Sequence, residues 1–187
     1  MNRFLTLSAL AVVAAPGVAM AQSTQSQSVV VNGNVPQACV LGSPSNATLD
    51  LGTLTDSTGR LRSELTGTTV AASTTINSAW CNTPSRLTMT SSPLMLVTTP
   101  NYATPTGFSR ELTYTVNLTN WQAPVTARPT VANTQTTVDS TQPHAAQPMN
   151  VEFSQLAPLS GTSEAGTNFL EAGAYSATVS ITLAAVS

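Results

Sequence analysis

The amino-acid sequence predicts an all-β domain of the immunoglobulin-like β-sandwich class. Apolar and polar residues alternate through six to eight short stretches, which is the period of a strand with one buried face. Turn-forming residues separate these stretches, and helical spacing is absent beyond residue 21. The chain has two cysteines, enough for one disulfide. A sandwich of short strands, closed by one disulfide, is therefore the economical fold.

The first 21 residues are predicted to be a secretory signal peptide. Arg3 precedes an apolar run over residues 4–15, and Ala19-Met-Ala21 supplies a cleavage site. The run has about a dozen residues, fewer than the roughly 20 that a membrane-spanning helix needs. Cleavage after Ala21 leaves 166 residues (187 − 21), enough for one domain. We expect an exported protein without membrane insertion.

The strand pattern can be followed along the chain after the polar residues 22–28. Three loops are expected between strands: a surface loop at residues 60–67, a long loop at 121–148 and a loop of small residues at 160–168. In the stretch 70–81, Ile76 and Trp80 should share one face, with Trp80 in the core beside the disulfide. Strands are expected at residues 29–35 continued by 39–41, then 47–52, 70–81, 86–90, 94–97, 111–119, 149–154 and 175–185, with an edge strand near 134–138.

The stretch 175–185 has the longest apolar face. Its apolar side chains stand at odd positions and its hydroxyl side chains at even positions between them. No later strand follows in this sequence to cover its edge, so we expect a partner from earlier in the chain or from another chain. The apolar positions are Tyr175, Ala177, Val179, Ile181 and Leu183.

Cys39 and Cys81 are expected to form a disulfide. An exported chain folds in an oxidising compartment, and a single pair is most simply one bond. The bond would close a loop of 42 positions (81 − 39), worth on the order of 4 kcal/mol. A metal or redox pair is disfavoured because the spacing is wide and no histidine stands near.

Composition argues against catalysis and against nucleic acid. Without Arg3 the chain has 5 arginines, no lysine and 8 acids, a formal net charge of −3, so no basic patch is expected. His144, the one histidine, lies in the 121–148 loop, where a catalytic base would lack rigid support. One histidine cannot build a zinc site, and the carboxylates are scattered. We predict no enzyme activity, no metal and no cofactor.

Four motifs in chain order resemble those of one family. They are Gly33-Asn-Val-Pro-Gln-Ala-Cys39, Leu49-Asp-Leu-Gly-Thr-Leu54, Ala79-Trp-Cys-Asn82 with Leu87-Thr-Met-Thr90, and Leu170-Glu-Ala-Gly-Ala-Tyr175. Together they resemble the chaperone–usher pilins, nearest the spore coat protein U-like, Csu-type branch. The resemblance spans residues 29–187, which we predict to be a single pilin-like domain.

The resemblance implies an incomplete sandwich that lacks its last strand. A periplasmic chaperone would fill the groove beside residues 175–185, and at the outer-membrane usher a neighbouring subunit's N-terminal extension would replace it. That extension would be residues 22–35, with Val29, Val31 and Val35 as candidate donor-strand anchors. Two positions depart from the family: residues 22–28 are polar, and Val186 replaces a penultimate tyrosine. The implied product is a cell-surface fibre that contributes to adhesion or biofilm.

A second hypothesis remains open from the residues alone. The chain could be a monomeric, secreted immunoglobulin-like binding module that does not polymerise. Trp121 and the 122–148 loop would then form its contact surface.

Overall fold

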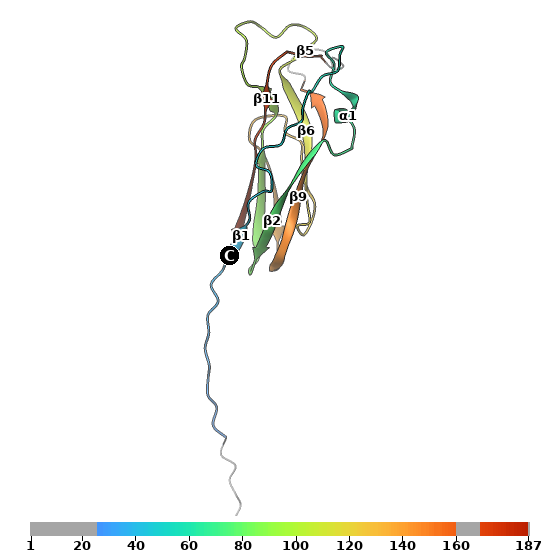
Figure 1. Ribbon diagram of the computed structural model, residues 1–187. Helices are drawn as coiled ribbons and strands as arrows, with labels where there is room; N and C mark the ends of the chain where they lie inside the picture. The colour runs from blue at the N-terminus through green and yellow to red at the C-terminus, as the bar shows by residue number, and fades with distance from the viewer. Residues whose placement is uncertain (1–25, 160–168, 187) are drawn as a thin grey trace, which may run out of the picture. The chain divides into compact units, whose positions relative to one another are not determined.

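The computed structural model describes residues 26–159 and 169–186 (Figure 1). The expected signal peptide and the 160–168 loop lie outside these residues. A compact unit begins at Pro36. Residues 26–35 contain no strand, and Val29, Val31 and Val35 are 88%, 89% and 81% exposed. The expected strand at 29–35 is therefore wrong, because Asn32-Gly33-Asn34 and Pro36 disfavour a β-ladder directly after the valines.

The all-β class is confirmed. The described residues contain one helix of a single turn and twelve strands. These elements are β1 (Cys39–Leu41), α1 (Ser63–Thr66), β2 (Ala72–Cys81), β3 (Ser85–Ser91), β4 (Leu94–Leu96), β5 (Phe108–Ser109), β6 (Glu111–Thr119), β7 (Val125–Ala127), β8 (Thr134–Ser140), β9 (His144–Pro158), β10 (Phe169–Leu170), β11 (Tyr175–Ser176) and β12 (Val179–Ala185).

Two antiparallel sheets form the immunoglobulin-like sandwich. The larger has the order β1-β2-β9-β6-β4-β11, with β7 also paired to β6, and Figure 1 shows β2, β9 and β6 as neighbours. The smaller has the order β12-β3-β8, and β10 and β5 form a short parallel pair. The core is apolar and includes the fully buried Leu87, Met89, Leu112, Val116, Leu118 and Met149.

The chain changes sheets at Pro93. Strands β3 and β4 flank this residue, and Pro has no N–H to continue a ladder. Ser92 maintains the link across the corner: its N–H donates to the Thr178 carbonyl at 3.1 Å, and its Oγ accepts from the Thr178 N–H at 3.0 Å. The expected strand 175–185 is consequently split. β11 pairs with β4 in the larger sheet, and β12 pairs with β3 in the smaller.

A bulge in β2 reverses the expected faces of this strand. Its register against β9 shifts between Ile76 and Ala79, so Ile76, Ala79 and Cys81 are buried while Trp80 is only half-buried and outside the core. A one-residue slip moves every following side chain to the other face. The prediction that Trp80 is a core residue is wrong.

Trp121 is the buried tryptophan, at 5% exposure. Its ring stacks on His144 with 4.1 Å between centroids. His144 begins strand β9 instead of lying in a loop, because the 121–148 segment contains β7, β8 and the start of β9. Trp121 is therefore not the exposed contact residue that the binding-module hypothesis expected.

Residues 47–52 were expected as a strand and form a loop. The Asp50 carboxylate accepts from the Gly52 N–H at 2.8 Å, and Gly52 has a φ of +66°, so local turn chemistry replaces the ladder. Residues 60–67 were expected as surface loop, yet they include α1, with Leu61 and Leu65 buried. The predictions for residues 86–90, 111–119 and the 134–138 edge strand are confirmed by β3, β6 and β8.

Candidate functional site, an open groove beside β12

One flank of the candidate site is fixed by the disulfide. β1 pairs antiparallel with β2, which places Cys39 directly opposite Cys81, and the two are bonded. The predicted disulfide is confirmed. It holds Leu41, the last residue of β1, at the start of the wall described next.

An open groove of about 1140 Å³ lies between two segments of the compact unit. One wall comes from residues between Leu41 and Thr55, and the other from residues between Leu170 and Ile181. This volume exceeds the roughly 300–1,000 Å³ of a typical small-molecule site. The floor is apolar and includes Ile76, Leu94, Tyr114, Val151, Phe153 and Leu156.

The free edge of β12 forms part of the second wall. Among the described residues β12 pairs only with β3. The Thr178 carbonyl accepts from the Ser92 N–H, and the Val186 N–H donates to the Pro84 carbonyl. The even-numbered residues of this segment therefore direct their backbone groups toward β3. In an antiparallel ladder the alternate residues direct their N–H and C=O groups to the opposite side. Val179, Ile181 and Leu183 therefore present unpaired backbone groups along this edge.

The opposite wall is also unpaired. Residues 47–51 make no backbone–backbone hydrogen bond to any part of the chain that the structure describes. Leu49, Leu51 and Leu54 on this wall are half-buried, as are Val179 and Ile181 on the other. Both walls thus have backbone groups without a partner among the described residues, and apolar side chains lie between them.

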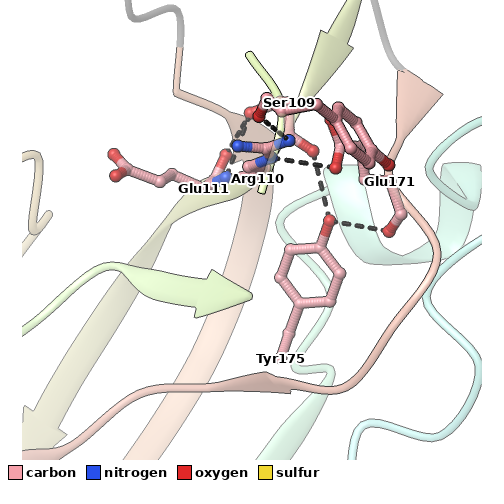
Figure 2. Close-up of polar contacts among 6 residues, drawn as sticks. Ser109, Arg110, Glu111, Glu171 and Tyr175 are labelled. Carbon is pink, nitrogen blue, oxygen red and sulfur yellow. Dashed lines mark hydrogen bonds and ion pairs between the residues drawn. The ribbon is translucent and has the colours of Figure 1, made fainter. Parts of the chain in front are cut away.

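A polar network fixes one end of the groove (Figure 2). Arg110 Nε donates to Glu171 Oε2 at 2.8 Å, and the two side chains are only 14% and 5% exposed. The hydrogen bond from Arg110 to this carboxylate raises the pKa of Arg110. Such an enclosed charge pair holds together the segment between β5 and β6 and the segment after β10, since either charge alone would be buried without compensation.

Tyr175 belongs to the same network. Its hydroxyl contacts two carbonyls, Ser109 O at 3.1 Å and Glu171 O at 2.9 Å (Figure 2). Burial, with a smaller contribution from the Glu171 carboxylate, raises the pKa of Tyr175 to about 12. The tyrosine is therefore a neutral donor at physiological pH, and it ties β11 to the segment around Ser109.

Gly173 permits the close approach of the same segment to β4. Its φ is +152°, and a Cβ there would lie 2.5 Å from Leu96 Cδ1. No side chain fits this position without displacing Leu96. The Ala-Gly-x-Tyr motif found in the sequence thus has a local structural role: the glycine allows close packing and the tyrosine anchors the turn.

The expected site residues fall into two groups. Tyr175, Ala177, Val179 and Ile181 line the groove, whereas Leu183 lies farther along β12, outside its lining. The candidate anchors Val29, Val31 and Val35 are solvent-exposed. Sequence reasoning missed the 41–55 wall and the Arg110–Glu171 pair; the alternating Leu49 and Leu51, followed by Leu54, were the available signal for the wall.

Across residues 26–159 and 169–186, no three His, Cys, Asp or Glu side chains are grouped as a metal ion would need. Over the same ranges, no helix has the length and apolar character to cross a bilayer.

Comparison with known proteins does not assign a family to the chain. No family model matches it, and no curated protein matches it. The chain is similar to one chain in a solved structure of a chaperone–tip adhesin complex of CFA/I fimbriae biogenesis, with 16% sequence identity and a TM-score of 0.36. The match covers 76% of this chain and 40% of that one, so the chain spans about two-fifths of that protein's length.

Proposed function

We propose that the domain is a structural subunit of a surface fibre and that it accepts a β-strand from a neighbouring copy. The observation that carries this proposal is the groove with two unpaired walls and an apolar floor. An added strand would hydrogen-bond to β12 on one side and to residues 47–51 on the other. Side chains at alternate positions of that strand would enter the groove, which is recognition by β-augmentation.

The donor is the N-terminal extension, residues 22–35, of the next copy. Val29 and Val31 are its alternating large side chains, with Val35 farther along, and all three are exposed in the described chain. Burying two valines contributes about 3–6 kcal/mol by transfer. Backbone pairing adds to this value. A head-to-tail contact of this kind does not close on itself, so repeated donation builds a fibre.

An open apolar edge must be covered before the neighbour arrives. Unpaired strand edges promote aggregation. We therefore propose a periplasmic chaperone that occupies the groove first, and an outer-membrane usher where the neighbour's strand replaces it. The fibre would stand on the cell surface and contribute to adhesion or biofilm.

The test is assembly in the presence of the chaperone and usher. The mature chain should give multimers that dissociate on heating, seen by gel electrophoresis. Deleting residues 22–31 should abolish the multimers and leave the chaperone complex intact. A mature chain that is stable and monomeric without a chaperone, with or without the deletion, would instead support the monomeric binding module.

The chain supplies a matched control for the anchors. Val29 and Val31 point to one face of an extended strand, and Val30 points to the other. Val29→Asp with Val31→Asp should abolish multimers, because a charge would enter the apolar groove. Val30→Asp adds one carboxylate to the opposite face and should leave assembly intact, whereas either Val29→Asp or Val31→Asp alone, with the same single charge, should already reduce it. Equal loss in both variants would contradict strand donation.

A further inference from the structure

A second hollow, of about 370 Å³, lies outside the groove. It is formed by the end of α1, the residue after β7 and the last four residues of β9, and it shares only Leu156 with the groove lining. Its volume is at the small end of the range for ligand sites, roughly 300–1,000 Å³. The lining residues are Thr66, Arg128, Gln155, Leu156, Ala157 and Pro158.

Arg128 differs from the other arginines of the described chain. Three of them form ion pairs with carboxylates, and Arg60 lies over the Phe169 ring at 4.8 Å. Arg128 does neither within residues 26–159 and 169–186. Its one hydrogen bond there runs from Nη1 to Thr115 Oγ1 at 3.2 Å. A guanidinium has five N–H donors, so most of its donors remain for a ligand.

Gln155 supplies a second donor beside the guanidinium. The buried Thr115 accepts from Arg128 and donates onward to Gln155 Oε1 at 2.7 Å. Because this contact engages the amide oxygen, the two N–H groups of Gln155 are left as donors. Thr115 thus orients both side chains that line the hollow.

The backbone at Gln155 supports a functional role. Its φ is +52°, a left-handed conformation that residues other than glycine, asparagine and aspartate rarely adopt. It lies where the register between β6 and β9 shifts, and its N–H donates to Gly67 O at 3.0 Å. Glycine would relieve the strain but would remove the amide. Non-glycine residues in strained conformations cluster at binding sites.

We propose that this hollow binds the carboxylate of an acidic sugar, such as a hexuronate residue. The planar guanidinium fork of Arg128 matches a carboxylate with two parallel hydrogen bonds, and the Gln155 amide donates a third. Ala157, which stands on the same face of β9 as Gln155, gives apolar surface beside these donors on which one side of a sugar ring can lie. The site is independent of the groove, so it does not depend on fibre assembly.

The experiment is a binding titration of the mature chain, purified in the complex in which it is stable, with sodium glucuronate. Isothermal titration at constant ionic strength should give saturable binding. Glucose, which lacks the carboxylate, should bind at least about tenfold more weakly, the loss expected for one charged hydrogen bond. Equal affinity for glucose, or tighter binding of inorganic phosphate than of glucuronate, would overturn the proposal.

Three variants separate binding from folding. Arg128→Gln should weaken glucuronate binding by at least about tenfold, and Arg60→Gln should leave it unchanged. Gln155→Gly should leave the thermal midpoint within a few degrees of the wild type, because relief of the positive φ offsets the lost hydrogen bond from Thr115, and should still weaken binding several-fold. Unchanged affinity in a folded Arg128→Gln variant would overturn the assignment.

Discussion

Strands β8 and β12 are the two edges of one three-stranded sheet, and they differ in the side chains that they carry. Both pair with β3 over all seven of its residues, so their backbones are equally regular. β8 carries threonine, glutamine and aspartate, with Val138 its one apolar side chain. β12 carries Val179, Ile181 and Leu183 at its alternate positions.

The difference indicates how pairing can be directed to one edge. β8 is polar, and its Asp139 pairs with Arg86 on the neighbouring strand at 2.6 Å. Polar and charged edges discourage pairing with another chain. β12 has no such protection and borders the groove. A subunit that must accept a strand at one place needs one closed edge and one open edge, and this sheet has both.

The first prediction places the same charge on each edge. Ile181 on β12 and Thr136 on β8 both stand opposite Met89 of β3. Ile181→Lys should reduce chaperone-dependent multimers at least about tenfold, because the lysine enters the apolar groove. Thr136→Lys should leave assembly unchanged. Multimers can be quantified by gel densitometry without heating, and an equal loss in both variants would remove the distinction between the edges.

The second prediction concerns the disulfide, which fixes the flank opposite β12. Replacing Cys39 and Cys81 together by serine should lower the free energy of unfolding by about 2–5 kcal/mol. The loss should appear as a lower urea midpoint. As a control, reductant should shift the wild-type midpoint by the same amount and leave the double variant unchanged. A variant as stable as the wild type would show that β1 is held by its backbone pairing alone.

The sequence predicted the strands whose alternation continues without interruption. β6 covers residues 111–119, and β3 and β8 lie at or within two residues of their expected bounds, since a period of two is preserved where both faces keep a constant environment. The disulfide followed from cysteine count and compartment. These features depend on local pattern and need no knowledge of neighbouring strands.

The groove could be predicted only in part because it depends on irregularities. A bulge after Ile76 reverses the face of Trp80. The corner at Pro93 places β3 and β4 in different sheets, so the expected 175–185 strand, which pairs with both, is divided between the two sheets. Leu49 and Leu51 alternate like a strand, yet the turn at Asp50 makes them a loop wall. Sequence periodicity does not report bulges, corners or unpaired walls, since these are set by tertiary contacts.

The third prediction tests how firmly the end of the open edge is anchored. Tyr175→Phe removes the hydroxyl that contacts the Ser109 and Glu171 carbonyls, and should cost about 1–3 kcal/mol in urea unfolding. It should also change how the free energy of unfolding depends on pH in the alkaline range. The pKa of Tyr175 rises from 10.0 to about 12 on folding, so its contribution is complete below pH 10 and is lost as the pH rises from 10 to about 12.

The variant should accordingly lose less stability than the wild type between pH 10 and 12. Tyr114→Phe is the matched comparison, because burial also raises the pKa of Tyr114 to about 12, and its hydroxyl donates to Ser92 O at 2.8 Å. Each single variant should keep part of the loss of stability between pH 10 and 12, because the other tyrosine still titrates there. An alkaline loss identical to the wild type in Tyr175→Phe would show that Tyr175 does not titrate in this range.

The last prediction, with the smallest expected effect, concerns the closed edge. Asp139 and Arg86 are each 52% exposed, and exposed pairs are strongly screened, so Asp139→Asn should leave the thermal midpoint unchanged at neutral pH. The hydrogen bond from Arg86 lowers the pKa of Asp139 below 3.8, so any contribution of the pair to stability is present above that pH and is lost as the pH falls through the lowered value.

The informative measurement for the closed edge is association. In a chain that lacks residues 22–31, Asp139→Asn should remain free of multimers, because the threonines and Gln135 still make the β8 edge polar. Multimers in that variant would mean that one carboxylate keeps β8 closed, and the contrast between the two edges would then rest on charge instead of on the polarity of the whole strand.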